Sequence, residues 1–280
     1  MGVKKTFGRL IGKTRRRAAH EINKSIKSDL DKNEVYNAKA ASHYKYSKDL
    51  ESKLEGEAAK SGAPKIYRFY DNKGPSNGSF IRKNATLEDV AEYVNANKGR
   101  SPVVEKEVIR FGKDVIDNGG KADGIVHPPS SSSVNLAHEI GHHLNSKSKN
   151  PVARALSARA NKESVRTGLE NAGNQAKDGV KGKDEPISGL KEMAKRIFDS
   201  NLVVREETKA TKKGLKLVRK HGDSDLVKDG KEQLGNYTEG YKAAARINWK
   251  LPLRNLVQIK SRKRLPVEKD IELWKRKKKK

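Results

Sequence analysis

The chain has 280 residues, of which 34% are hydrophobic and 35% are charged, and its formal net charge is +27. This length allows one sizeable domain or two modest ones, and the low apolar content predicts a folded centre with polar, extended ends. The absence of cysteine excludes disulfide scaffolds, iron–sulfur clusters and thiol catalysis, and it agrees with a reducing cytoplasm. No stretch approaches the roughly 20 apolar residues that span a bilayer, and the N-terminus lacks the pattern of a secretory signal.

Basic residues are concentrated towards the two ends of the chain. Such blocks repel one another, stay hydrated and attract polyanions by releasing counterions. They predict either two solubilising tails or unspecific contacts with nucleic acid or an acidic protein, since no base-reading motif accompanies them. The residues are Lys4, Lys5, Arg9, Lys13, Arg15, Arg16 and Arg17 near the start, and Arg262, Lys263, Arg264 and the run from Lys275 to Lys280 near the end.

Residues 1 to about 60 are predicted to be helical and polar. Weak apolar positions recur at the spacing of one helical stripe, which is typical of an arm or a partner-docking helix. Ser61, Gly62 and Pro64 then interrupt the pattern. We therefore expect a basic helical arm over residues 1–62. The apolar positions of its stripe are Leu10, Ile11, Ile22, Ile26 and Leu30.

The folded domain is predicted to begin with a strand at residues 65–70, which are dense in strand formers and precede a turn-rich loop at 71–78. Thr86 and Asp89 have the spacing of a capping pair at the start of a helix. The following segment, residues 103–115, is compatible with both a strand and a helix.

A short apolar run, Gly124-Ile125-Val126-His127, is stopped by Pro128 and Pro129. Because proline cannot donate a hydrogen bond to a sheet, the proline pair predicts an edge strand. The serines at 130–133 provide N-cap candidates for a helix from Val134 to about Asn145.

The second half of the chain is predicted to be mainly helical. Residues 168–186 are rich in glycine, asparagine and lysine, which is typical of a mobile loop. A basic tail is expected over residues 259–280. The predicted helices cover residues 151–160, 190–198, about 202–220 and about 226–247.

The sequence His138-Glu139-Ile140-Gly141-His142 is the strongest indication of chemistry. On a helix, residues four apart lie on the same face, so both imidazoles can bind one metal ion. Glu139 lies about 100° further round the helix, where it can accept a proton from an attacking water. A helix with surface histidines is the alternative, but an apolar row predicts that this helix has a buried side: Leu136, Ile140 and Leu144.

A catalytic zinc site needs a third protein ligand and one open position. The metzincin extension HExxHxxGxxH is absent, because Asn145 and Ser148 occupy its glycine and histidine positions. Further along, Glu207 falls on a helical face of small and apolar residues, whereas Glu206 is three residues from Lys209 on the hydrated side. A carboxylate on a buried face needs a compensating cation. We therefore predict Glu207 as the third ligand, with Glu206 as the alternative ligand or a surface ion pair.

These residues resemble the gluzincins, most closely the neutral zinc metallopeptidases of bacteria and phages, whose signature is HE-x-GH followed by E-x-D-A-S-x-x-A. The resemblance covers the two site helices, well under half of the chain. Lys209 replaces the aspartate of the signature, which leaves open what orients the histidines. Bacterial members of the family are membrane-bound, so the resemblance favours a soluble, phage-encoded relative. The matched positions are His138, Glu139, His142, Glu207, Ala210, Thr211 and Gly214.

Several further residues are candidates for the site. Tyr237 lies on a predicted helix after the motif, where it either packs in a core or donates its hydroxyl to an oxyanion. An edge strand before the site helix binds substrate by strand addition in zincins, which implies this role for residues 124–126. His127 is a further candidate ligand, and His143 is expected to support the site or to lie on the surface. The strand residues are Gly124, Ile125 and Val126.

The sequence therefore predicts an α+β fold, with a mainly helical zincin-like domain and a small sheet over residues 63–258, between the basic arm and the basic tail. The expected function is peptide-bond hydrolysis of a peptide or protein substrate, with Zn²⁺ as cofactor. His138, His142 and Glu207 are the expected metal ligands, with Glu139 as general base and Tyr237 assisting. The alternative is a structural protein of a phage particle or of DNA with an inactive or accessory zincin fold. We expect no membrane span and a cytoplasmic or virion-associated location.

Overall fold

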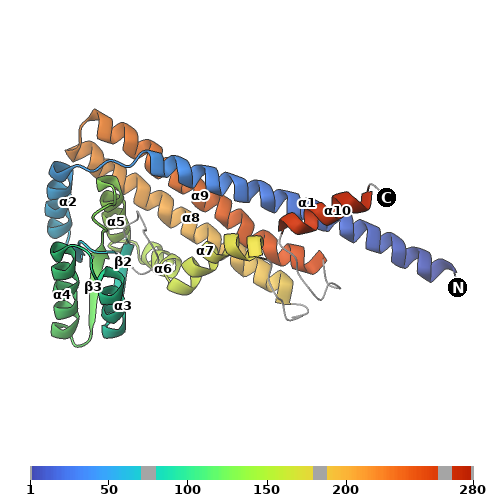
Figure 1. Cartoon of the computed structure of the whole chain (residues 1–280), viewed down its shortest axis with the longest axis horizontal. Helices are drawn as coiled ribbons and strands as arrows, with labels where there is room; N and C mark the ends of the chain where they lie inside the picture. Colours follow the sequence, from blue (N-terminus) through green and yellow to red (C-terminus); the bar gives the residue numbers. More distant parts are fainter. Residues whose placement is uncertain (1, 71–79, 179–187, 258–266, 279–280) are drawn as a thin grey trace. The chain divides into compact units, whose positions relative to one another are not determined.

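The computed structural model describes residues 2–70, 80–178, 188–257 and 267–278. These residues form an α+β chain that is mainly helical and contains one three-stranded sheet (Figure 1), as predicted. The strands are β1 (Lys65–Tyr67), β2 (Phe80–Thr86) and β3 (Lys121–Val126). The helices are α1 (Gly2–Ser42), α2 (Lys48–Lys60), α3 (Leu87–Asn97), α4 (Pro102–Asp117), α5 (Ser133–Ser146), α6 (Pro151–Ala160), α7 (Glu163–Asp178), α8 (Ser188–His221), α9 (Ser224–Val257) and α10 (Val267–Lys278).

The chain divides into two compact units, and several long helices contribute residues to both. Unit 1 comprises Met1–Asn37, Ala155–Arg205 and Thr238–Lys280. Unit 2 comprises Ala38–Arg154 and Glu206–Tyr237. The sheet, the HExxH helix and both candidate glutamates therefore belong to unit 2.

Strand β3 lies in the centre of the sheet, so the prediction of an edge strand at Gly124–Val126 is wrong. It pairs in parallel with β1 and antiparallel with β2, and both neighbours pair with residues 124–126. The two prolines follow the last paired residue, Val126, and therefore remove no hydrogen bond from the sheet. Strand β2 was not predicted, and its pairing with β3 is irregular between Arg82 and Ala85.

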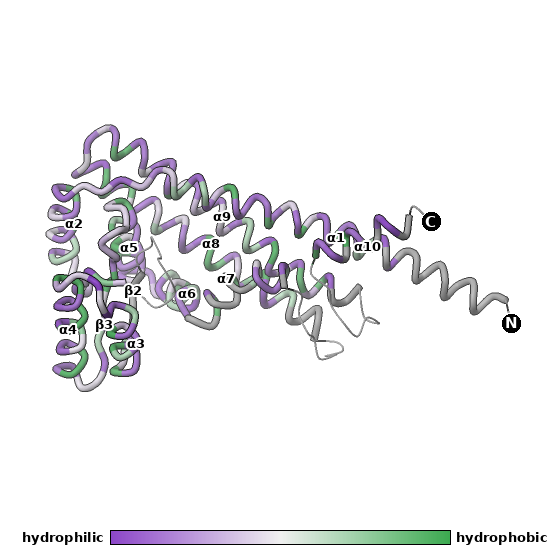
Figure 2. The backbone as a smooth tube through the Cα atoms, in the orientation of Figure 1, coloured by the Kyte–Doolittle hydropathy of each residue, from purple (hydrophilic) through white to green (hydrophobic). Residues whose placement is uncertain are grey.

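Residues of the sheet alternate between two hydrophobic clusters of unit 2, as the two-residue period of a strand requires. Tyr67, Ala122 and Val126 pack with α3 and α4 on one side. Ile66 and Ile125 belong to the other cluster, with apolar residues of α2, α5, α8 and α9. Figure 2 shows hydrophobic and hydrophilic residues alternating along α4, as expected of an amphipathic helix. Residues 103–115, which the sequence left open between a strand and a helix, therefore belong to helix α4.

Two of the predicted helix caps are present in unit 2. Thr86 and Asp89 form a capping box at the start of α3, in which each side chain accepts a hydrogen bond from the backbone of the other. Ser132 is the N-cap of α5, and its side chain accepts a hydrogen bond from the backbone nitrogen of Asn135. The helix that carries the HExxH sequence therefore starts where the serine run predicts.

Unit 1 is built from helices that share a core of their own. Ile26 and Leu30 of α1 are buried there, so these two residues are core residues, although the sequence suggested an exposed arm. Asp29 lies beside them and forms ion pairs with Arg246 and Lys250 of α9 (2.8 and 2.5 Å). The same core contains Ala172, Ala176, Ile247, Leu251 and Val267.

Other expectations for the second half are also corrected. Residues 168–178 belong to helix α7 rather than to a mobile loop, and residues 179–186 lie outside the described part. The loop predicted at 71–78 also lies outside it. Helix α8 joins the two helices that were predicted separately at 190–198 and 202–220. The expected extended tail contains helix α10, and no helix among the described residues is long and apolar enough to cross a membrane.

Candidate metal centre

Helix α5 places two imidazoles beside each other. His138 and His142 are four residues apart, and their Nε2 atoms are 3.2 Å apart. The two rings are perpendicular, with centroids 4.7 Å apart. His138, His142 and Glu139 between them are all buried, which excludes the alternative of an ordinary helix with surface histidines.

Helix α8 brings a carboxylate to the same point. Glu207 is 2% exposed, and its Oε2 atom lies 3.0 Å from His138 Nε2. Its Oε1 atom lies 3.4 Å from His142 Nε2. One ligand atom from each of the three side chains lies within 4.8 Å of the others. This is the one group of its kind among the described residues, and it contains the three predicted ligands.

Small residues allow the two helices to approach this closely. A Cβ atom at Gly141 would lie 2.4 Å from the carbonyl oxygen of Ala210. Conversely, a Cβ atom at Gly214 would lie 2.9 Å from the Cα atom of His138. The close crossing of α5 and α8 therefore depends on glycine at both positions, and it sets Glu207 against the histidine pair.

The candidate donors are close enough together to share one metal ion. The Nε2 atoms of His138 and His142 are 3.2 Å apart, and the two oxygens of Glu207 lie 3.0 Å from the first and 3.4 Å from the second. Ligands of a four-coordinate zinc ion are separated by roughly 3.3 Å. Two imidazoles and a carboxylate form a donor set suited to a divalent cation. This buried group could therefore hold a metal ion.

The outer nitrogens of both imidazoles are contacted by further residues of α8. Thr211 Oγ1 lies 3.4 Å from His138 Nδ1. Glu206 Oε1 lies 3.5 Å from His142 Nδ1 and accepts a hydrogen bond from Asn145 Nδ2 (3.1 Å). Such contacts fix the orientation of metal-binding imidazoles. Lys209, which stands where the resembled signature has an aspartate, is not among these contacts.

Glu206 is therefore not the surface ion pair that the sequence suggested. Its side chain is 3% exposed, and it contacts a histidine and an asparagine of α5 instead of Lys209. Sequence analysis considered Asn145 only as a mismatch to the metzincin pattern. Asn145 follows His142 by three residues and therefore lies on the same side of α5. This spacing was the sequence signal that a polar group faces that side of the helix.

The charges at the site favour a cation. Burial lowers the pKa of His142, but the carboxylates of Glu207 and Glu206 outweigh it and raise this pKa to about 9. In the absence of metal the imidazole thus binds a proton strongly. A metal ion would replace that proton, since only neutral imidazole acts as a ligand.

Two other predicted site residues lie in different surroundings. The hydroxyl of Tyr237 contacts the hydroxyl of Tyr44. Burial is the main cause that raises the pKa of Tyr237, and this contact is the second. No contact among the described residues joins it to the three donors. The residues of β3 at 124–126 are paired on both sides, so they have no free edge for an added substrate strand.

The remaining histidines near the motif have structural contacts. His127 Nδ1 accepts a hydrogen bond from Arg68, and its Nε2 lies 3.1 Å from the carbonyl oxygen of Ser132. Both ring nitrogens of His127 are therefore occupied away from the metal donors. His143 is buried rather than on the surface, and its Nε2 lies 3.3 Å from the carbonyl oxygen of Ser61 at the end of α2.

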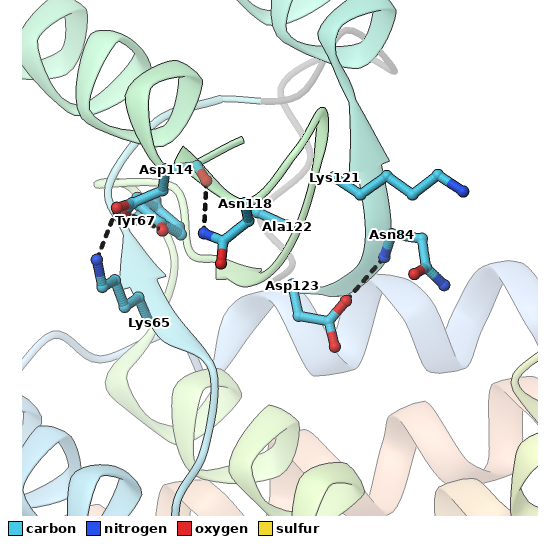
Figure 3. Close-up of a pocket in the computed structure, with 8 residues that line it drawn as sticks. All are labelled: Lys65, Tyr67, Asn84, Asp114, Asn118, Lys121, Ala122 and Asp123. Atoms are coloured by element: carbon cyan, nitrogen blue, oxygen red, sulfur yellow. Dashed lines mark hydrogen bonds and ion pairs between the residues drawn. The ribbon is translucent and has the colours of Figure 1, made fainter. Parts of the chain in front are cut away.

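A pocket of about 500 Å³ lies elsewhere in unit 2 (Figure 3). Its acidic groups are matched by neighbours: Asp114 accepts hydrogen bonds from Lys65 and Tyr67, and Asp123 accepts one from the backbone nitrogen of Asn84. Asn84 has a positive φ of 54° at the irregularity in β2. The pocket contains none of the metal donors. Its lining residues are Lys65, Tyr67, Asn84, Asp114, Asn118, Lys121, Ala122 and Asp123.

Comparisons with known proteins add no further evidence. A scan against protein-family models found no match, and searches of curated proteins and of solved structures found no similar chain. The interpretation of the site therefore rests on its own residues: two imidazoles and one carboxylate, brought together by two closely crossing helices.

Proposed function

We propose that the chain is a zinc-dependent peptidase. The observation that carries the proposal is the convergence of His138, His142 and Glu207, which come from two helices and each place one ligand atom within 4.8 Å of the others. These three side chains would hold the ion and leave its fourth position open to water, as in catalytic zinc sites. When bound, zinc lowers the pKa of a water molecule and polarises the substrate carbonyl group.

The residues of the chain have separate roles in this reaction. The metal ion would be bound by His138, His142 and Glu207. Thr211 and Glu206 contact the outer nitrogens of the two imidazoles and keep the rings in place. The Glu139 carboxylate, buried beside His138, accepts the proton of the attacking water and passes it to the leaving amine nitrogen. Tyr237 as a donor to the oxyanion stays a prediction.

The test is a pair of matched measurements on the purified full chain. We expect about one zinc per chain by elemental analysis and cleavage of a quenched fluorescent peptide library. Glu139→Gln should keep the metal and lose at least about 100-fold in rate, since general-base catalysis contributes about 10²–10⁴-fold. His43→Gln is the matched control, because His43 is partly buried but contacts Asp229 instead of the donors. A chain that binds no metal without exposure to chelator contradicts the proposal.

The alternative, a structural protein of a phage particle or of DNA, is favoured by the net charge of +27. It assigns binding of nucleic acid or acidic protein to the basic termini. Because Val267 of α10 is part of a core, deletion of the tail would also damage the fold. Replacement of the terminal lysines and arginines by glutamine is the cleaner test. The alternative requires that these changes abolish a salt-dependent shift in DNA mobility.

A further inference from the structure

Helix α8 carries a row of basic side chains on the side opposite Glu207. At 100° per residue, residues 209, 212, 216 and 219 all lie on the half of the helix that faces away from the donors. Lys212, Lys216 and Arg219 are exposed, and Lys209 is partly exposed. All four belong to unit 2. We call them the basic face: Lys209, Lys212, Lys216 and Arg219.

In the part of the chain that the structure describes, no acidic side chain pairs with the basic face. None of its four residues forms an ion pair within the described part of the chain, whereas Lys220, next on the helix, pairs with Glu57 (2.8 Å). The two acidic residues in this half of α8, Glu206 and Glu207, are buried at the histidine pair. Burial lowers the pKa of the neighbouring Lys213, the Glu206 carboxylate opposes this effect, and the charges of Lys209 and Lys216 lower the pKa further. The positive charges are thus close enough to repel one another.

The basic face has no apolar component. Leu215 and Leu217 of the same helix segment pack against the core of unit 2, and none of the exposed large hydrophobic residues found in the described part lies between 206 and 221. Protein interfaces are depleted in lysine and use aromatic and apolar anchors. Helices that bind membrane surfaces bury an apolar face. Phosphate backbones, in contrast, are bound largely by lysine and arginine and need no apolar anchor.

We propose that the basic face binds the phosphate backbone of a double-stranded nucleic acid without reading its sequence. From Lys209 to Arg219 the face is about 15 Å long at 1.5 Å per residue. A duplex presents one phosphate charge per about 1.7 Å of its axis, so all four cations meet phosphates along one short stretch. Because the face points away from Glu207, the bound duplex would not contact the three candidate metal ligands. This proposal therefore does not depend on the peptidase proposal.

The test compares two charge-reversal variants of the full chain that have the same net charge. One is K209E/K212E/K216E/R219E on the basic face. The other is K98E/K106E/K113E/K121E, at exposed lysines elsewhere in unit 2 that form no ion pair within the described residues. Binding to fluorescent 20-base-pair DNA and RNA duplexes is measured by anisotropy between 50 and 200 mM salt. Circular dichroism and metal content verify that both variants are folded.

We expect the basic-face variant to bind at least about tenfold more weakly, with a slope of log K against log salt smaller by about 3–4. The control variant should stay within about twofold of the wild type, because its changes lie away from the contact. Equal losses in both variants would overturn the proposal in favour of a general charge effect. Unchanged binding of the basic-face variant would also overturn the proposal, because the contact would then lie elsewhere on the chain. Binding of polyglutamate, but not of either duplex, would identify an acidic protein as the partner and overturn it too.

Discussion

Gly141 of α5 lies directly against the backbone of Ala210 of α8, where a Cβ atom would come within 2.4 Å of the carbonyl oxygen. Gly141→Ala should therefore force the two site helices apart. Overpacking of this kind costs about 1–3 kcal/mol of unfolding free energy, and separation of the helices should also lower metal affinity. Urea unfolding and metal titration measure both effects. The control is Gly56→Ala in α2, where a Cβ atom meets nothing within 4 Å, so stability should rise by about 0.5–1 kcal/mol.

The two adjacent glutamates should respond differently to the same change. Glu207→Gln removes a charged donor at 3.0 Å from His138, and we expect metal affinity to fall by more than about 100-fold. Glu206→Gln leaves all three donors and weakens only the support of His142, so affinity should fall by about 10–100-fold with the stoichiometry unchanged. Competition with a fluorescent zinc chelator gives both constants. The reverse order would make Glu206 the third ligand.

Metal binding should release a proton near neutral pH. The pKa of His142 in the metal-free protein is about 9, so its imidazole is protonated at pH 7.5 and must become neutral to bind a metal. Protonation of His142 alone should therefore lower the affinity for the metal ion about tenfold for each pH unit below 9. Calorimetry in buffers with different ionisation enthalpies should show release of about one proton at pH 7.5. Affinity that is independent of pH between 6 and 8 would contradict the assignment.

Removal of the metal should reduce stability in a manner that depends on concentration. An ion that binds only the folded chain raises the unfolding free energy by about 2.7 kcal/mol at 100 times its dissociation constant. Thermal unfolding of the chelator-treated protein with increasing zinc should thus show a rising midpoint. His138→Gln should abolish this rise, while the chelator-treated forms of both proteins should unfold within a few degrees of each other.

His127 should make the fold sensitive to acid. Burial, together with the nearby Arg68 guanidinium, lowers the pKa of His127 to about 3, and an unfolded histidine titrates near 6.5. Because the folded chain binds this proton more weakly than the unfolded chain, the unfolding free energy is highest above about pH 6.5. It decreases as the pH falls from about 6.5 towards 3. Between pH 7.5 and 5 the loss is about 2 kcal/mol. Chemical unfolding at both pH values should show this loss in the wild type but not in His127→Gln. In that variant Glu51 and Arg68 still lie beside residue 127 and pair with each other.

The site was predictable because its residues follow local periodicity. The histidines are four apart, and Glu207 shares a helical face with Val203, Ala210 and Gly214, all of which are buried. The role of Glu206 was not predictable in this way. Its partners, His142 and Asn145, are 64 and 61 residues away in sequence, so only the tertiary structure shows why a glutamate close to Lys209 is buried.

The sheet and helix α7 were harder to predict for related reasons. Strand β2 contains lysine, asparagine and arginine and forms because it can pair with β3. The prolines after β3 suggested an edge strand, but they lie beyond the paired residues. Helix α7 is polar apart from a few positions such as Leu169, Ala172 and Ala176, which are buried in the core of unit 1. Tertiary packing outweighs weak local propensity at these elements.

The third donor is separated from the first by 69 residues of chain. During synthesis on the ribosome the histidine pair is therefore complete long before Glu207 has been added. If the three side chains bind an ion as proposed, a nascent chain would retain it firmly only after the segment around 207 has emerged and docked on α5. Metal capture would then be a late event in folding, and an ion held against a competing chelator would report that α8 has docked on α5.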